Sequence, residues 1–299
     1  MGIANFSLPS NSSDGDKFDG HFFEFQRYIQ NEVNYMTAIC VTAIIICTTL
    51  FGNAAILITI WKTSSLHSVA NILLSSLAVS DLSVGLVVQP LFIASLRWRT
   101  YLAFILYVIF GTFFIIASFL NVTAIGIERL LALQLHLRYN AEVTSFRATV
   151  VIILIWFFSG IVSSFSLWIP KVFYIAPSIL YISVLAGNFV VYLKIYLIIR
   201  RHQRQIQHQQ QQQQHNIFSD VKRFKRTALK TFFACIVLIC CYMPYSLVVK
   251  IALTEGFKFS TRVYFITVAL IFLNSTINPL LYYWRDKEIR TALKQLFCC

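Results

Sequence analysis

The sequence predicts an all-α membrane protein: a seven-transmembrane helix bundle with a short amphipathic eighth helix at the cytoplasmic surface. Apolar residues make up 58% of the 299-residue chain and charged residues only 12%, about half the ~25% typical of soluble domains. The apolar residues gather in seven long runs, and a bilayer-crossing helix needs ~20 residues of this kind. The basic residues, which give a net charge of +13, form short clusters between those runs.

Each apolar run is long enough to cross a bilayer as a helix. In chain order the expected spans are 35–61, 69–96, 101–133, 148–168, 174–199, 226–252 and 261–284. Only a short segment around Pro170 and Lys171 parts the fourth run from the fifth. We therefore expect a very tight loop there. The three parts of the chain are then a tail (1–34), the seven-span domain (35–284) and a C-terminal segment (285–299).

The basic clusters predict the orientation. With the N-terminus outside, most Lys and Arg residues fall on the cytoplasmic side, as the positive-inside rule requires. We expect a multi-pass protein of the plasma membrane with an extracellular N-terminus and a cytoplasmic C-terminus. The partner of the basic clusters is then membrane lipid and not nucleic acid. Asn5 and Asn11 each begin an Asn-x-Ser triplet in the outward tail and are candidate glycosylation sites.

The loop before the sixth span, residues 202–221, contains six consecutive glutamines. Such a low-complexity stretch is typical of a solvated loop, and a tolerated insertion is the simplest interpretation.

Cysteines are placed where they exclude an extracellular disulfide. All seven lie in the first span, in the sixth span or at the chain end: Cys40, Cys47, Cys235, Cys240, Cys241, Cys298 and Cys299. The last two follow an amphipathic stretch, 285–297. Palmitoylation of Cys298 and Cys299 would hold that stretch at the membrane; the alternative is two unmodified thiols.

Asp81 is the only carboxylate in the core of an expected span, and ionisable groups at that depth are functional candidates. Further polar side chains at a similar depth are Asn53, Ser118, Asn274, Ser275 and Asn278. Together they offer oxygens that suit a small hard cation such as Na⁺. The alternative is a protonated or water-bonded Asp81 without an ion.

Other polar and helix-bending residues follow in a fixed order. Glu128 and Arg129 end the third span, while Pro244 and Pro279 interrupt the sixth and seventh, where proline bends a helix. This order resembles the rhodopsin-like (class A) family of G-protein-coupled receptors over residues 35–299. The residues that carry the resemblance are Gly52-Asn53, Asp81, Glu128-Arg129, Trp156, Tyr192, Pro244 and Asn278-Pro279-x-x-Tyr282, one set in each span.

The resemblance implies a receptor and not an enzyme, with a heterotrimeric G protein as its partner and no cofactor. It implies that Asp81, Ser118, Asn274, Ser275 and Asn278 form a sodium pocket, with Na⁺ as an allosteric ion. It also implies that the sixth span moves outward about Pro244 on activation. The implied coupling and switch residues are Glu128, Arg129, Tyr192, Tyr242, Pro244, Pro279 and Tyr282.

Several positions depart from the family pattern. Leu130 stands in place of a tyrosine, Phe224 in place of an acidic partner for the third-span arginine, and Tyr242 in place of a tryptophan. Val184 replaces the fifth-span proline and Phe104 the cysteine at the top of the third span. We therefore do not expect the usual ion pair between Arg129 and the sixth span. Because that restraint on the inactive state is missing, we expect measurable signalling without ligand.

The ligand does not follow from the resemblance. Gly111 stands where amine receptors carry an aspartate, and Phe272 stands where opsins carry the retinal lysine. The departures are similar to the melanocortin, cannabinoid and lysophospholipid branch, and part of the fifth span is similar to adenosine receptors, but the binding residues of those receptors are absent. Lys250 could pair with an anionic ligand or snorkel to the headgroups. Candidate ligand-binding residues are Gln89, Tyr107, Gly111, Thr112, Tyr245, Val249, Lys250 and Phe265.

Two other functions stay open at this point. A decoy receptor would bind ligand without signalling, which the departures at Leu130 and Tyr242 allow. A small-solute transporter is disfavoured because the spans show no internal repeat.

Overall fold

The structure is a computed structural model that describes residues 34–98, 100–135, 138–168, 182–191, 193–198, 200–201, 236–248, 251 and 261–297. All regular elements within these ranges are helical. The expected tight loop at Pro170 and Lys171 and the glutamine-rich loop 202–221 lie outside them.

Five of the expected spans are long apolar helices. Four of them are the single helices α2 (Asn34–Lys62), α5 (Tyr101–Leu135), α7 (Ser145–Trp168) and α10 (Thr261–Arg285). The remaining one is a continuous helical span made of α3 (Val69–Ser83), the π-helical turn η2 (Val84–Val88) and α4 (Gln89–Trp98). The short elements are the 3-10 turn η1 (Ser64–Leu66) and α6 (Tyr139–Glu142). Helix also covers 182–191, 193–198 and Ile236–Val248, where the fifth and sixth spans were expected. The seven-helix bundle predicted from the apolar runs is confirmed.

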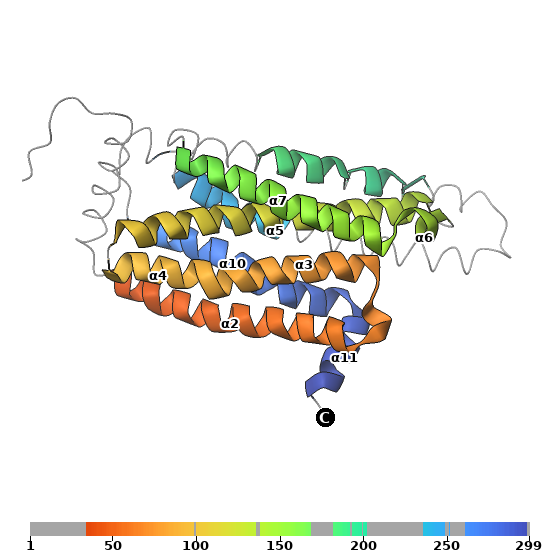
Figure 1. Cartoon of the computed structure of the whole chain (residues 1–299), viewed down its shortest axis with the longest axis horizontal. Helices are drawn as coiled ribbons and strands as arrows, with labels where there is room; N and C mark the ends of the chain where they lie inside the picture. The colour runs from red at the N-terminus through yellow and green to blue at the C-terminus, as the bar shows by residue number, and fades with distance from the viewer. Residues whose placement is uncertain are drawn as a thin grey trace, which may run out of the picture.

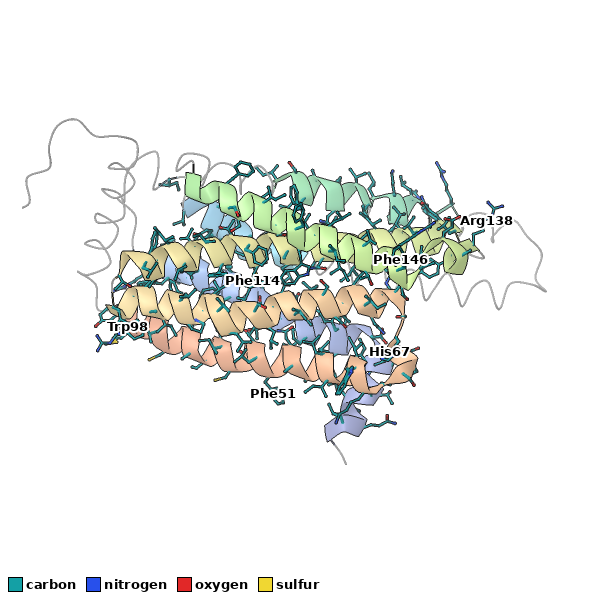
Figure 2. The ribbon with its side chains drawn as sticks, in the orientation of Figure 1. Phe51, His67, Trp98, Phe114, Arg138 and Phe146 are labelled. Atoms are coloured by element: carbon teal, nitrogen blue, oxygen red, sulfur yellow. The ribbon has the colours of Figure 1, made fainter. Side chains whose placement is uncertain are left out.

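The long helices run side by side along the long axis of the molecule (Figure 1). α3 packs against α2 and α5, α5 packs against α7, and α10 packs against α2. Figure 2 labels Trp98 and Arg138 at opposite ends of the bundle, and we name the two ends after them.

Many apolar side chains lie on the outside of the bundle. Phe51, Phe157 and Phe189 are each more than 60% exposed, and Phe51 points away from the neighbouring helices in Figure 2. A soluble domain would not expose so many large apolar side chains. The interior, in contrast, buries polar groups that include Asp81 and Asn53. Apolar outside and polar inside is the arrangement that lipid as a solvent favours.

Glycines allow two close helix approaches. A Cβ added to Gly52 of α2 would lie 3.0 Å from Pro279 Cγ, inside α10. One added to Gly85 of η2 would lie 2.9 Å from Leu50 Cδ2 of α2. Both glycines thus bring α2 close to the two helices that carry the buried polar residues.

The eighth helix, α11 (Lys287–Phe297), packs against α2 and α10. Ile289, Ala292 and Leu293 are buried, while Lys287 and Lys294 are exposed, so the helix has the amphipathic character predicted for it. It begins two residues later than the stretch expected from the sequence. The reason is that Asp286 Oδ1 accepts a hydrogen bond from the Glu288 backbone N–H at 2.9 Å, which caps the helix start.

Candidate functional site

The buried polar centre of the bundle is the carboxylate of Asp81 in α3, which is fully buried. Asn278 Nδ2 donates to its Oδ2 at 2.7 Å, and Ser275 Oγ donates to its Oδ1 at 2.9 Å. Ser118 Oγ, from α5, reaches Oδ1 at a longer 3.5 Å. One carboxyl group therefore joins α3, α5 and α10, and it meets the requirement that a buried polar group be hydrogen-bonded.

Asn53 and Asn274 lie beside this centre without touching the carboxylate directly. Asn53 Nδ2 donates to the Thr49 and Ser275 carbonyl oxygens, both at 3.0 Å, so it ties α2 to α10. Its Oδ1 and both amide atoms of Asn274 are buried and have no hydrogen-bond partner. Of the six residues predicted to form a sodium pocket, four meet at the carboxylate, and the other two leave polar atoms free nearby.

A π-helical turn follows Asp81 within one turn of the helix. The Val84 N–H closes α3 by donating to the backbone carbonyls of Asp81 and Ser80, and the Gln89 N–H at the end of η2 donates to the Val84 carbonyl five residues before it. Turns of this kind are rare and frequent at functional sites. The sequence shows no sign of this turn apart from Gly85, whose lack of a side chain admits Leu50.

The second polar group lies at the Arg138 end of α5. Arg129 Nε is 3.2 Å from Glu128 Oε2, close enough for an ion pair although the two atoms are not aligned for a hydrogen bond. Tyr139 OH, from α6, donates to Glu128 Oε1 at 2.5 Å. Glu128 thus contacts both its neighbour in the chain and the loop helix.

Tyr139 was not predicted as a functional residue, because a loop tyrosine eleven residues away carries no spacing signal. Burial raises its pKa above the usual tyrosine value, and the hydrogen bond to Glu128 and the charge of Glu128 raise it further, while Arg129 lowers it. The phenol consequently stays protonated, and remains a donor, at physiological pH.

Two further hydrogen bonds join neighbouring spans. Asn188 Nδ2, on helix 182–191, donates to Thr123 Oγ1 of α5 at 2.8 Å and to the Val184 carbonyl at 2.9 Å. Trp156 Nε1 of α7 donates to Ser76 Oγ of α3 at 3.1 Å. Asn188 was missed in the sequence, although a polar residue in an apolar span is itself a signal.

The predicted switch residues lie along the interior. Tyr242 packs on Phe119 of α5 with ring centroids 4.5 Å apart. Pro244 is partly buried in helix Ile236–Val248, and Tyr282 is buried in α10. Pro279 faces Gly52 of α2. Tyr192 lies outside the described residues.

The candidate ligand residues of α4, α5 and α10 gather towards the Trp98 end. Phe92, beside Gln89 in α4, packs against Tyr107 at 5.2 Å between ring centroids and against Phe272 at 5.5 Å. Tyr264 packs on both Tyr245 and Phe265. A side-chain hydrogen bond between Tyr107 and Tyr264 joins these two groups of rings. Tyr107, Tyr245 and Phe265 therefore lie in one region, with Gly111 and Thr112 about one turn further along α5.

Several predictions fall on residues that the structure leaves undescribed. They are the glycosylation sites Asn5 and Asn11, the ligand candidates Val249 and Lys250, the palmitoylation sites Cys298 and Cys299, and Phe224. The described cysteines Cys40, Cys47, Cys240 and Cys241 are free thiols.

Comparison with known proteins gives the same family as the residue pattern. The family model described as "7 transmembrane receptor (rhodopsin family)" matches residues 52–174 and 166–282. The chain is 27% identical to the histamine H2 receptor of Canis lupus familiaris over 88% of this chain and 80% of that protein. It is 24% identical to the histamine H2 receptor of Homo sapiens over the same shares. It is also 26% identical to melanocortin receptor 5 of Mus musculus, over 84% of this chain and 81% of that protein.

The family match spans most of the chain, and it includes Asp81, Arg129 and Pro279, which the structure places inside one helical bundle. Members of this family are multi-pass membrane receptors that signal through G proteins, and they are not enzymes. The chain belongs to the rhodopsin-like family of seven-transmembrane receptors.

Proposed function

We propose that this receptor lies in the plasma membrane with the Trp98 end outside, binds an extracellular ligand there and activates a heterotrimeric G protein at the Arg138 end. The charge distribution supports this orientation, because Arg147, Arg200 and Arg201 lie on the Arg138 side of their spans and basic residues favour the cytoplasmic side. Asn5 and Asn11 would then be open to glycosylation outside. Cys298 and Cys299, directly after α11, would lie at the inner membrane surface, where palmitoylation occurs.

The observation that carries the proposal is the Asp81 centre, where one buried carboxylate joins three spans. The hydrogen-bonded groups around Asp81 can pack in only a few stable ways, as expected for a helix bundle that switches between an inactive and an active state. The oxygens of Asp81, Ser118 and Ser275 fit a Na⁺ ion, because both hydroxyl groups can turn their lone pairs towards a cation. Na⁺ bound there would balance the carboxylate charge and favour the arrangement in which these oxygens converge.

Activation would open the Arg138 end. Pro244 removes one backbone hydrogen bond from helix Ile236–Val248, so this helix can swing outward while Tyr242 changes its packing on Phe119. The opened face would expose Arg129 to the C-terminal helix of the G-protein α subunit, which binds as a helix in a groove. Tyr192, Pro279 and Tyr282 would line or support the same opening.

The ligand differs from that of the amine receptors. Two relatives are named histamine receptors, but a protonated amine needs a carboxylate, and Gly111 supplies no side chain at the position where amine receptors carry it. Phe272, which packs against Phe92, cannot form the Schiff base of an opsin.

The test measures nucleotide exchange on purified Gs, Gi and Gq heterotrimers by the receptor in lipid nanodiscs, without ligand. We expect exchange above that of empty nanodiscs, and loss of it in Arg129→Ala. Arg147→Ala is the matched control: Arg147 lies at the same end but pairs with the exposed Glu142, so this variant should retain exchange.

Each other outcome points to a different function. A folded receptor that activates none of the three G proteins would support the decoy function, and solute flux across proteoliposomes would support a transporter. Full exchange by Arg129→Ala would contradict the coupling mechanism.

A further inference from the structure

Gln89 is a buried amide without a partner. Its side chain is fully buried at the start of α4, and neither Oε1 nor Nε2 has a hydrogen-bond partner. Most buried polar side chains in the described core are hydrogen-bonded, often to a carbonyl of their own helix, as Ser95 is to the Phe92 carbonyl at 2.7 Å. A buried amide whose donor and acceptor both lack a partner destabilises an apolar interior, unless a bound molecule supplies the missing hydrogen bonds.

The Gln89 amide lies on the same helix face as a cluster of aromatic side chains. Gln89 and Phe92 are three residues apart in α4 and therefore share one face of the helix. Phe92 packs against Tyr107 of α5 and Phe272 of α10, so this face looks between α5 and α10. Eight residues separate Gln89 from Asp81, about 12 Å along the helix axis. The amide is therefore clearly separate from the sodium-pocket residues.

Space adjoins the same region on α5. A Cβ added to Gly111 would have a single heavy atom of another helix within 4 Å, Val88 Cγ1 at 3.5 Å. Val88 is the residue directly before Gln89. The absence of a side chain at Gly111 therefore leaves the space beside the start of α4 uncrowded on the α5 side.

The region has no buried charge to offer a ligand. Among the described residues, the buried charged side chains are Asp81 and Glu128, both far from Gln89 towards the Arg138 end. Burying an ion without an opposite charge is strongly unfavourable. A neutral group that both donates and accepts a hydrogen bond, in contrast, would pair with both atoms of the Gln89 amide.

We propose that Gln89 and Gly111 form a subsite for an uncharged, amide-like group of the ligand, and that Phe92, Tyr107 and Phe272 hold an adjoining apolar or aromatic part. The proposal rests on the proposed function only in taking the Trp98 end as the ligand side. It names a neutral ligand, in contrast to the cationic amines, and assigns its recognition to two residues.

Three small probes of nearly equal shape test the charge preference: benzamide, which is neutral, benzamidine, a cation, and benzoate, an anion. Their binding to the receptor in nanodiscs is measured by saturation-transfer NMR, with empty nanodiscs as the background. We expect benzamide to bind about tenfold more tightly than either ion, the effect of one or two hydrogen bonds without the cost of an unpaired charge. Equal binding of all three probes would overturn the proposal.

Variants locate the subsite. Gln89→Leu should remove benzamide binding, and Gly111→Leu should remove it by filling the space. Gln89→Glu, which changes only the charge, should reverse the preference in favour of benzamidine. Ser95→Ala, in the same helix, is the control and should bind benzamide as the wild type does. Benzamide binding unchanged in both Gln89→Leu and Gly111→Leu would overturn the assignment.

Two measurements separate this inference from the proposed function. The NMR experiment needs no G protein, so probe binding without nucleotide exchange would uphold the subsite and reject coupling. Exchange without a preference for benzamide would do the reverse. Thermal unfolding of each variant shows whether it is folded, and Gln89→Leu should be at least as stable as the wild type, because it removes two unmet polar atoms.

Discussion

Tyr139 donates a hydrogen bond of 2.5 Å to Glu128, so the loop helix α6 is fastened to the end of α5 through the residue next to Arg129. Glu128 is 4% exposed and also pairs with Arg129. The tyrosine thereby fixes how the carboxylate faces the arginine. The sequence predicts no acidic partner for Arg129 in the sixth span. Among the described residues, the restraint on Arg129 is therefore its pairing with Glu128, which Tyr139 holds in place.

Removal of the Tyr139 hydroxyl should loosen that restraint. In Tyr139→Phe the Glu128 carboxylate is free to turn away from Arg129, and we expect ligand-free nucleotide exchange to rise about threefold to tenfold, the effect of one ordinary hydrogen bond. Tyr283→Phe, which alters a tyrosine that is 39% exposed in α10, should leave exchange unchanged. An identical rate in the wild type and Tyr139→Phe would show that the contact does not restrain Arg129.

The same bond should persist over the physiological pH range. Because the pKa of Tyr139 is raised in the folded protein, its contribution to stability is complete below the ordinary tyrosine pKa and is lost only as pH rises through the higher folded value. The wild type and Tyr139→Phe should therefore differ in melting temperature by the same amount at about pH 6 and about pH 8, because both values lie below the ordinary tyrosine pKa. A difference that vanished at pH 8 would contradict this sign.

Sodium should stabilise the receptor through Asp81. An ion that binds the resting bundle raises its stability by mass action, and by linkage it opposes activation. Replacing K⁺ by Na⁺ at constant ionic strength should raise the melting temperature and lower ligand-free exchange. Asp81→Asn should abolish both responses, while Glu142→Gln, at an exposed carboxylate, should keep them. A sodium response that survives in Asp81→Asn would place the ion elsewhere.

The hydrogen bond between Asn188 and Thr123 should couple the fifth span to α5. A double-mutant cycle with Asn188→Leu and Thr123→Val isolates this pair, and we expect a coupling free energy of about 0.6 kcal/mol, the usual value between membrane helices. The measurement is the free energy of unfolding of the wild type, both single variants and the double variant. Strict additivity of the two single effects would mean that the contact contributes nothing to stability.

Gly52 and Gly187 offer a matched test of helix packing. A Cβ at Gly52 would lie 3.0 and 3.1 Å from two atoms of Pro279, whereas a Cβ at Gly187 would have nothing within 4 Å. Gly52→Ala should therefore lower stability by about 1–3 kcal/mol through overpacking. Gly187→Ala should be neutral or slightly stabilising, because alanine favours a helix. Equal melting temperatures for the two variants would contradict the close approach of α2 and α10.

The spans could be predicted from the sequence because lipid imposes a simple rule. A helix must satisfy its own backbone and present apolar side chains over the full bilayer thickness, so the runs at 35–61 and 101–133 already locate α2 and α5 to within a few residues. The polar residue Asp81 stood out against the same apolar background. Ser275 and Asn278 could be predicted from the sequence as polar residues at a similar depth, but only the family resemblance put them in one pocket with Asp81, because they are nearly two hundred residues away.

The sequence by itself determined that the chain spans a membrane seven times and which few polar groups lie inside, because the cost of burying charge in lipid leaves a plain pattern along the chain. Tertiary structure alone decided which of those groups meet. The contacts of Tyr139 with Glu128 and of Asn188 with Thr123, and the unpartnered amide of Gln89, depend on how helices rotate and approach one another. Helix rotation and approach depend on side-chain packing between segments far apart in the chain, which no local pattern records.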